Sequence, residues 1–253
     1  MTVQLSEILT VCNQLLQPEQ FEDYCPNGLQ VAGAENVKKI ISGVTASQAL
    51  IEAAIEHDAQ AILVHHGYFW KGDDPKITGM LRQRLKLLLA NDISLIAFHL
   101  PLDAQPEFGN NASLAKQLGL RITGGLEGNA DRSIGLLGEL EQPMAGDEFA
   151  RILAQKLDRV PLYIEGSTPC IKTIAWCTGA AQSFIARAAE LKVDAYLTGE
   201  ASEQTVHVAR ETGLHFFAAG HHATERYGVQ ALGELLAEKL GVEHRYIEID
   251  NPV

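Results

Sequence analysis

The sequence predicts an α/β protein built from two halves that are related by an internal duplication. Short apolar runs that end in small or polar residues alternate with longer stretches of helical period, which is the layout of α/β proteins. The same layout returns in the second half of the chain, together with matching residues. These two observations set the fold class, and each element is justified below in chain order.

The first half contains three predicted strands and three predicted helices. The strands are expected at 39–44, 59–64 and 93–98, and the helices at 48–57, 81–90 and 111–118. Gly119 follows the last helix, where a glycine ends a helix in the left-handed conformation at little cost. Together these elements form one complete α/β half.

The duplication is visible at two sequence shifts. A shift of 134 residues matches Gln48 with Gln182, Ile51 with Ile185 and Ala61 with Ala195. A shift of 122 residues matches His99 with His221, Leu118 with Leu240 and Gly119 with Gly241. The difference, 134 − 122 = 12, predicts extra residues in the first half, in the loop that carries the sequence YFWKGDDP at 68–75.

The second half continues the pattern after a segment rich in glycine and acidic residues at 124–143. Asp147 is expected to cap a helix that runs to about Leu157, and strands are expected at 215–218 and 245–250. We place the boundary near residue 125, which gives an N-terminal half at 1–125 and a C-terminal half at 126–253. If the halves interweave, a single cut does not describe them.

Composition excludes several classes of protein. Among 253 residues, 46% are hydrophobic and 21% charged, which indicates a folded globular chain rather than a disordered one. The formal charge of −12 opposes non-specific nucleic-acid binding. The four cysteines form no CxxC pair, which favours reduced thiols. The sequence contains no signal peptide and no apolar run of the ~18 residues that a membrane span needs. We therefore expect a cytoplasmic protein.

Histidines and acids follow three of the predicted strands. His65 and His66 come after the strand that ends at Val64, His99 and Asp103 after the strand ending at Phe98, and His221 and Glu225 after the strand ending at Ala218. Ligands collect at the carboxyl ends of strands in α/β sheets. A lone histidine there is more often a hydrogen-bonded polar residue, but this set matches the ligands of divalent transition metals. The pattern predicts a metal site.

Five motifs carry a resemblance to a known family. They are VHHG at 64–67, HLPLDA at 99–104, GNNA at 109–112, TGE at 198–200 and GHHATE at 220–225. This ordered set resembles the type 2 GTP cyclohydrolase I homologs, also called the Nif-three-like family. The resemblance spans essentially the whole chain, which has the length of the compact bacterial members.

The resemblance implies a fold, an assembly and a set of ligands. The fold would consist of two intertwined α/β halves with mixed sheets, and the protein would assemble into a hexameric ring. Two divalent ions per subunit, of Zn, Fe, Mn, Co or Ni, would be held by five side chains, with Glu225 as the bridge: His65, His66, Asp103, His221 and Glu225. His99, His222 and Glu200 are then the candidates for proton transfer, in that order. His222 has the alternative of merely packing or hydrogen-bonding beside its neighbour, and Glu200 of orienting a ligand or capping a helix.

The implied activity is hydrolysis. Hydroxide generated by the ions would attack the purine ring of a nucleotide such as GTP and release formate. Two alternatives stay open, a metal-dependent nucleotide phosphohydrolase and a metal-binding regulatory or adaptor protein. The sequence has no phosphate-binding glycine loop. Basic residues at 71, 82, 84, 86 and 226 are candidates for a phosphate entrance, and the aromatic residues at 68–70 for stacking on a base or packing against a neighbouring subunit.

Overall fold

A computed structural model of the chain describes residues 2–128 and 130–253. The chain divides into two compact units, each formed by two separate segments. Unit 1 comprises Met1–Leu102 and Gly228–Asp250, and unit 2 comprises Asp103–Tyr227 and Asn251–Val253. This division differs from the expected cut near residue 125, because the chain enters unit 2 at Asp103 and returns to unit 1 at Gly228.

Unit 1 is built on a five-stranded mixed sheet with the order β13-β4-β5-β6-β2. Its strands are β2 (Gly28–Val31), β4 (Lys39–Thr45), β5 (Ala61–His66), β6 (Ser94–Ala97) and β13 (Glu243–Tyr246). Neighbours from β13 to β6 run parallel, and β2 pairs antiparallel with β6. A separate antiparallel pair joins β1 (Val3–Gln4) to β3 (Asn36–Val37). The central strands are buried along almost their whole length, as expected of parallel strands with both faces covered.

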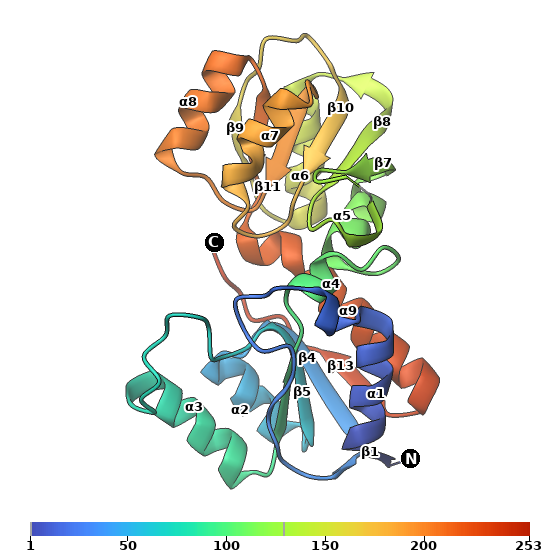
Figure 1. The fold of residues 1–253 in the computed structure, drawn as a ribbon, viewed down its shortest axis with the longest axis vertical. Helices are drawn as coiled ribbons and strands as arrows, with labels where there is room; N and C mark the ends of the chain where they lie inside the picture. The colour runs from blue at the N-terminus through green and yellow to red at the C-terminus, as the bar shows by residue number, and fades with distance from the viewer. Residues whose placement is uncertain (1, 129) are drawn as a thin grey trace. The chain divides into compact units, whose positions relative to one another are not determined.

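Helices flank the unit 1 sheet. They are α1 (Leu5–Leu16), α2 (Gln48–Glu56), α3 (Gly79–Ala90) and the C-terminal part of α9 (His221–Leu240), with a short 3₁₀ turn at Pro18–Gln20. In Figure 1, α2 and α3 lie on one side of the strands and α1 and α9 on the other. Leu50 and Leu88 pack from α2 and α3 against Ile62 and Leu95 of the sheet. The Ser47 hydroxyl caps α2 by accepting a hydrogen bond from the backbone N–H of Leu50.

Unit 2 contains a six-stranded mixed sheet with the order β7-β8-β10-β11-β12-β9. Its strands are β7 (Leu120–Gly125), β8 (Leu136–Met144), β9 (Leu162–Ile164), β10 (Ile171–Trp176), β11 (Ala195–Thr198) and β12 (His215–Ala218). β10, β11 and β12 are parallel, whereas β7, β8 and β9 pair antiparallel with their neighbours. The segment expected to separate the halves therefore forms the β7–β8 hairpin inside this sheet.

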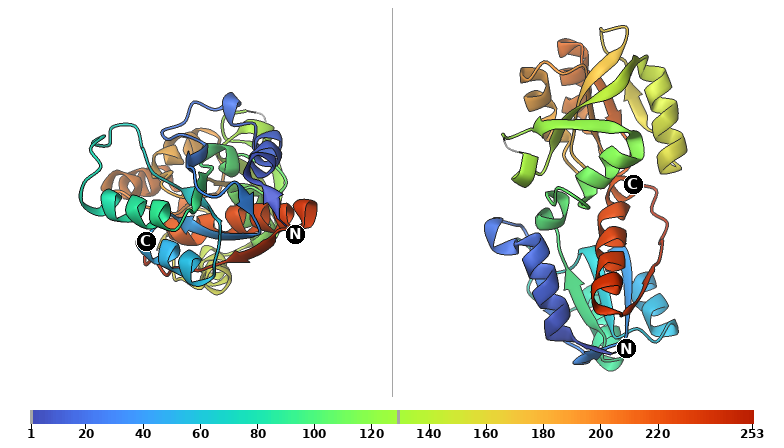
Figure 2. Two further views of the ribbon diagram at one scale, coloured as in Figure 1. Left: turned by 90° about the horizontal axis from the view of Figure 1, so that it is seen from below. Right: turned by 90° about the vertical axis from the view of Figure 1, so that its right-hand side faces the viewer.

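Two cores cover the two faces of the unit 2 sheet. The helices of this unit are α5 (Asn110–Leu118), α6 (Gly146–Leu157), α7 (Ile185–Glu190) and α8 (Glu203–Thr212), with 3₁₀ turns at Ala130–Arg132 and Gln182–Phe184. Trp176 and Phe217 pack with α5 and α6, and their neighbours Ala175 and Phe216 pack with α7 and α8. This alternation follows the two-residue period of a strand. Figure 2 shows α6 and α8 on opposite sides of the sheet.

The two sequence repeats exchange their last helix and strand. Unit 1 contains β4-α2-β5-α3-β6, and unit 2 contains the matching series β10-α7-β11-α8-β12. The first series continues into α5 and β7, which belong to unit 2, whereas the second continues through α9 into β13, which pairs with β4 of unit 1. Gly119 and Gly241 end α5 and α9 with φ of 66° and 71°. The structure thus confirms the intertwined α/β fold with mixed sheets.

Most predicted elements are present, with two corrections. Asp147 does not cap helix α6, which begins after Ala145 without a side-chain cap. Asp147 lies in the first turn, where its Oδ2 is 3.6 Å from Nη2 of Arg151. The last strand is Glu243–Tyr246 rather than 245–250, because pairing with β4 and not the alternating pattern sets its limits. The extra length of the first repeat lies largely in the loop at 67–78, which corresponds to the short loop at 199–202.

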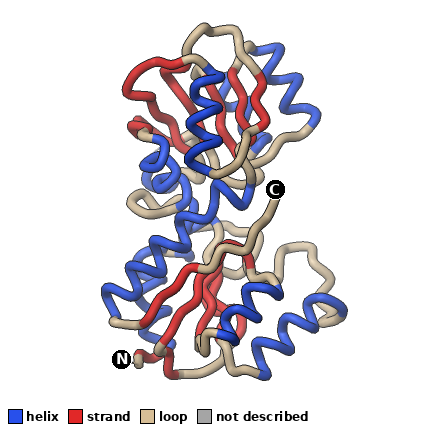
Figure 3. Tube along the Cα trace, turned by 180° about the vertical axis from the view of Figure 1, so that it is seen from behind, coloured by secondary structure: helices blue, strands red, loops and turns tan. Residues whose placement is uncertain are grey.

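Figure 3 shows the helices and strands along the chain trace. None of the helices within the described ranges combines the length and apolar composition that crossing a membrane requires. The short helix α4 (Leu100–Asp103) follows β6 and carries the chain from one unit into the other.

Candidate functional site

Unit 1 presents two adjacent imidazoles at the end of β5. His65 and His66 are the last residues of the strand, and their rings lie next to each other. The Nδ1–H of His65 donates to the carbonyl of Phe98, at 2.9 Å, and Nδ1 of His66 lies 3.2 Å from the hydroxyl of Thr45. Each ring is thus tied to the strand on its own side, and the two ring centres lie 4.6 Å apart.

His99, which follows β6, joins this pair. Its ring centre lies 5.1 Å from that of His65 and 5.9 Å from that of His66. The three residues can offer one ligand nitrogen each, all within 4.8 Å of one another. The Nδ1–H of His99 donates to Asp23 at 2.7 Å. The structure therefore brings together the histidines that follow two neighbouring parallel strands, as the sequence predicts.

The hydrogen bonds at Nδ1 favour one ring tautomer. A backbone carbonyl and a carboxylate only accept hydrogen bonds, so His65 and His99 carry a proton on Nδ1. Their neutral forms then have the lone pair on Nε2, so this nitrogen can either bind a metal or accept a proton. Metal-binding histidines typically donate their second N–H to a carbonyl or carboxylate in this way. Unit 1 thus provides a donor set suited to a divalent transition metal.

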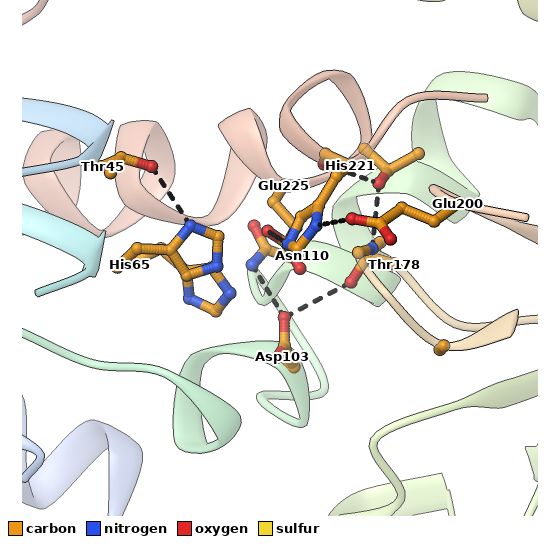
Figure 4. Close-up of polar contacts among 12 residues, drawn as sticks. Thr45, His65, Asp103, Asn110, Thr178, Glu200, His221 and Glu225 are labelled. Carbon is orange, nitrogen blue, oxygen red and sulfur yellow. Dashed lines mark hydrogen bonds and ion pairs between the residues drawn. The ribbon is translucent and has the colours of Figure 1, made fainter. Parts of the chain in front are cut away.

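Unit 2 provides an oriented carboxylate at Asp103. Its Oδ1 accepts a hydrogen bond from the amide of Asn110 at 2.8 Å and another from the hydroxyl of Thr178 at 3.3 Å (Figure 4). The amide of Asn111 fixes the surrounding backbone, since its Nδ2 donates to Ile134 and its Oδ1 accepts from the N–H of Thr178. Asn110 and Thr178 therefore fix the orientation of Asp103.

The first turn of α9 adds an imidazole and a second carboxylate. His221 and Glu225 are four residues apart and therefore lie on one face of the helix, with Nε2 and Oε2 3.0 Å apart. The Nδ1–H of His221 donates to Glu200 at 2.7 Å (Figure 4). Burial alone would lower the pKa of His221, but the hydrogen bonds and charges of Glu225 and Glu200 outweigh it and raise that pKa from 6.5 to about 9. A cation bound to Nε2 would displace the proton there.

Glu225 lies at the centre of the unit 2 group. Its carboxylate can offer an oxygen within 4.8 Å of a ligand atom of Asp103, and likewise of His221. Two carboxylates so close together repel each other unless a proton or a cation lies between them. Gly179, with φ of 69°, leaves room for this arrangement, because a Cβ there would overlap Oε1 of Glu225. The donor set of unit 2 therefore also fits a divalent cation.

The aromatic segment after β5 has three different roles. The Tyr68 hydroxyl donates to the carbonyl of Ala46, and its ring is part of the core. Phe69 has a left-handed backbone (φ 64°) and is 41% exposed. The Trp70 ring packs edge-to-face on His99, with centres 4.9 Å apart, and its Nε1–H donates to Gly67. Trp70 thus packs beside His66 and His99.

Two of the basic residues that are candidates for a phosphate entrance make contacts within the protein. Arg226 donates to the carbonyl of Leu157 at the end of α6 and lies over the ring of Tyr227. Arg84 lies over the ring of Tyr68, with the guanidinium 5.9 Å from the ring centre. The guanidinium group of each residue thus packs on the ring of a tyrosine.

Comparison with known proteins places the chain in a family. The family model described as Duf34/NIF3 (NGG1p interacting factor 3) matches residues 3–252. The chain belongs to the Duf34/NIF3 family. A relative from Pseudomonas aeruginosa, named GTP cyclohydrolase 1 type 2 homolog, is 56% identical over 252 residues and 100% of both chains. A relative of the same name from Escherichia coli K12 is 52% identical over 248 residues, which is 98% of each chain.

The fold of this Duf34/NIF3 chain also matches solved structures. A structure described as protein ybgI, of unknown function, has a TM-score of 0.96 at 51% identity, and the match covers 99% of this chain and 100% of that one. These comparisons confirm the family resemblance that the five sequence motifs carry.

His222 takes a different position from its neighbour. Consecutive helical residues point about 100° apart, so its side chain leaves α9 in another direction from that of His221. Its backbone N–H donates to the carbonyl of Val253 at 3.0 Å. The structure groups Glu200 with the His221–Glu225 pair.

Sequence reasoning missed several residues of this Duf34/NIF3 site. They are Asp23, Asn27, Thr45, Thr178 and Gly179, together with Asn110, which lies inside a recognised motif without having been assigned a role. The internal duplication could have identified two of these residues. The shift of 134 residues that matches His66 with Glu200 also matches Thr45 with Gly179, and both of these lie beside a candidate ligand.

Proposed function

We propose that this chain is a metal-dependent hydrolase with a dinuclear centre. The ligands in this proposal are those that the family resemblance implies, with Glu225 as the bridge between two divalent ions: His65, His66, Asp103, His221 and Glu225. Imidazole and carboxylate donors suit Zn, Fe, Mn, Co and Ni alike, so the donor set does not select one metal. We also propose the cytoplasmic location and the hexameric ring that the family resemblance implies.

The proposal rests on the hydrogen bonds that hold the candidate ligand side chains in place. His65 and His221 each donate Nδ1–H to a fixed acceptor, and Asp103 accepts two hydrogen bonds. Such partners orient ligands and raise their affinity for metal.

The reaction that we propose is hydrolytic opening of the purine ring of a nucleotide such as GTP, with release of formate. When bound, two ions would lower the pKa of a water molecule and polarise the base. A ring nitrogen of His99 lies within 4.8 Å of a ring nitrogen of His65 and of His66. His99 is therefore placed to accept a proton beside these two histidines. Glu200 holds His221 in the orientation in which Nε2 faces Glu225. The relatives are named as homologs of GTP cyclohydrolase 1 type 2, which supports this choice of substrate.

The test is a nucleotide panel incubated with protein reconstituted separately with each of the five metals. Mass spectrometry would follow formate and pterin products, and a colorimetric assay would follow free phosphate. Metal-free protein and the Glu225→Gln variant serve as controls. We expect formate and a ring-opened purine from GTP, in amounts that depend on the metal and on Glu225.

The other outcomes discriminate the alternatives. Free phosphate without formate would contradict ring opening and identify a metal-dependent phosphohydrolase. Metal binding without turnover of any nucleotide would contradict an enzymatic role and favour a regulatory or adaptor protein that a partner recognises in its metal-loaded form.

A further inference from the structure

The buried carboxylate of Asp23 holds the ring of His99. The side chain of Asp23 is only 4% exposed, and its two oxygens each accept two hydrogen bonds. Oδ1 accepts from the Nδ1–H of His99 and the N–H of Tyr24, at 2.7 and 2.6 Å. Oδ2 accepts from the amide of Asn27 and the N–H of Leu100, at 2.8 and 2.9 Å. With both oxygens fully engaged, Asp23 is an anchor for His99 rather than a metal ligand.

Strand pairing explains how residues so far apart in sequence meet. β2 pairs antiparallel with β6, and Gly28 lies opposite Ala97. Asn27 therefore lies beside the segment that leaves β6, where its Oδ1 accepts a hydrogen bond from the backbone N–H of His99 at 2.7 Å. The loop before β2 thus holds both the backbone and the ring of His99.

The charge of Asp23 is maintained at neutral pH. Burial opposes ionisation of its carboxyl, but the hydrogen bonds from His99 and Asn27 outweigh it and lower its pKa from 3.8 to about 2. An ionised Asp23 only accepts hydrogen bonds, so it requires the proton of a neutral His99 to be on Nδ1.

We propose that Asp23 is a positioning residue that holds His99 in its Nδ1–H tautomer, so that Nε2 accepts the proton of the attacking water. This inference rests on the proposed hydrolase function and deepens it. As the water oxygen forms its bond to the ring carbon, its proton moves to Nε2 and gives an imidazolium. The electron pair of the attacked C=N bond moves to its ring nitrogen. The imidazolium then gives its proton to the other ring nitrogen, which leaves as its bond to that carbon breaks. The second proton of the water passes from the new hydroxyl to the first ring nitrogen, and the product is a formamide. Asp23 stabilises the intermediate imidazolium and stays ionised throughout.

The first test is the tautomer itself, in metal-free protein. Solid-state NMR of protein labelled with ¹⁵N-histidine reports which ring nitrogen carries the proton, and the His99→Gln variant assigns the signals. We expect Nδ1–H for His99 in the wild type. In Asp23→Asn, the new amide faces four donors. The imidazole of His99 can become an acceptor, whereas a flip of the Asn27 amide would turn its NH₂ against the N–H of His99. We therefore expect the ring proton of His99 to move to Nε2.

The second test is kinetic, with the substrate that the nucleotide panel identifies. Asp23→Asn should lower kcat by on the order of 10²- to 10⁴-fold with little change in KM or metal content. In a His99→Gln background the same change should cost almost nothing further, because Asp23 acts through His99. Asp58→Asn is the matched control: Asp58 is exposed, and asparagine tolerates its left-handed backbone (φ 52°), so kcat should not change.

Three results would overturn the proposal. One is wild-type His99 protonated on Nε2 alone, which needs no variant and holds even if Asp23→Asn fails to fold. Another is a tautomer change in Asp23→Asn with unchanged kcat. The third is an equal loss of kcat in the wild-type and His99→Gln backgrounds, which would indicate a purely structural role. Absence of any nucleotide turnover would instead contradict the proposed hydrolase function, and the NMR comparison would still decide whether Asp23 sets the tautomer.

Discussion

Gly179 lies so close to Glu225 that any side chain at position 179 would overlap the carboxylate. We expect Gly179→Ala to displace Glu225 and to lower the bound metal per chain, measured by inductively coupled plasma mass spectrometry. The left-handed backbone (φ 69°) adds a stability cost of about 1 kcal/mol. Gly119→Ala is the matched control, because Gly119 has φ of 66° with nothing within 4 Å of a Cβ. It should lose similar stability and keep its metal. Equal metal content in the two variants would contradict the role given to Gly179.

The bridging role that we propose for Glu225 predicts a loss of metal without a loss of fold. Glu225→Gln keeps the size of the side chain but removes the charge that faces Asp103 and His221. We expect bound metal to fall to half or less, with a circular dichroism spectrum like that of the wild type. Glu234→Gln, an exposed change on the same helix, should bind metal normally. An unchanged metal stoichiometry in Glu225→Gln would count against Glu225 as a ligand.

Glu200 acts on the site through His221. Replacing Glu200 with glutamine removes the anionic acceptor at Nδ1, 2.7 Å away, and leaves Glu225 in place. We expect metal affinity to fall by roughly 10- to 100-fold, as is typical when the partner of a metal-binding histidine is lost. Isothermal titration calorimetry of the metal-free variants measures the change. Glu203→Gln is the control, since Glu203 faces only the exposed His207, and its affinity should match that of the wild type.

Local sequence patterns predicted the elements that carry the ligands, because those patterns arise within single elements. The apolar run that ends at Val64 identifies β5, and the histidines that follow it extend that strand. The repeat that matches Gly119 with Gly241 likewise predicts where α5 and α9 end. Both signals depend only on residues that are near one another in the chain.

These local patterns could not predict which segments far apart in the sequence contact each other. The partnership of Asp23 with His99 depends on the register between β2 and β6, and the loop that holds Asp23 has no periodicity to mark it. The exchange of β13 into the unit 1 sheet has the same origin, since nothing in the residues of β13 specifies β4 as its neighbour. A single cut near residue 125 does not describe the two units for this reason, as expected if the halves interweave.

His244 makes the stability of the fold depend on pH. It lies on β13 with Nε2 2.8 Å from the hydroxyl of Ser42 on β4, and burial lowers its pKa below the ordinary 6.5. The unfolded chain therefore takes up a proton at this residue more readily than the folded chain as the pH falls through 6.5. The contribution of neutral His244 is complete above that pH and is lost progressively toward its lower folded pKa.

We accordingly expect the free energy of unfolding to fall between pH 7 and pH 5 by more in the wild type than in His244→Gln, which cannot titrate. Urea denaturation at several pH values, with metal-free protein, measures the difference. His57→Gln is the control for a general effect of histidine removal, because His57 ends α2 and uses its backbone rather than its ring to contact Lys39. Its pH dependence should follow that of the wild type. Parallel curves for wild type and His244→Gln would show that His244 does not titrate differently in the folded chain.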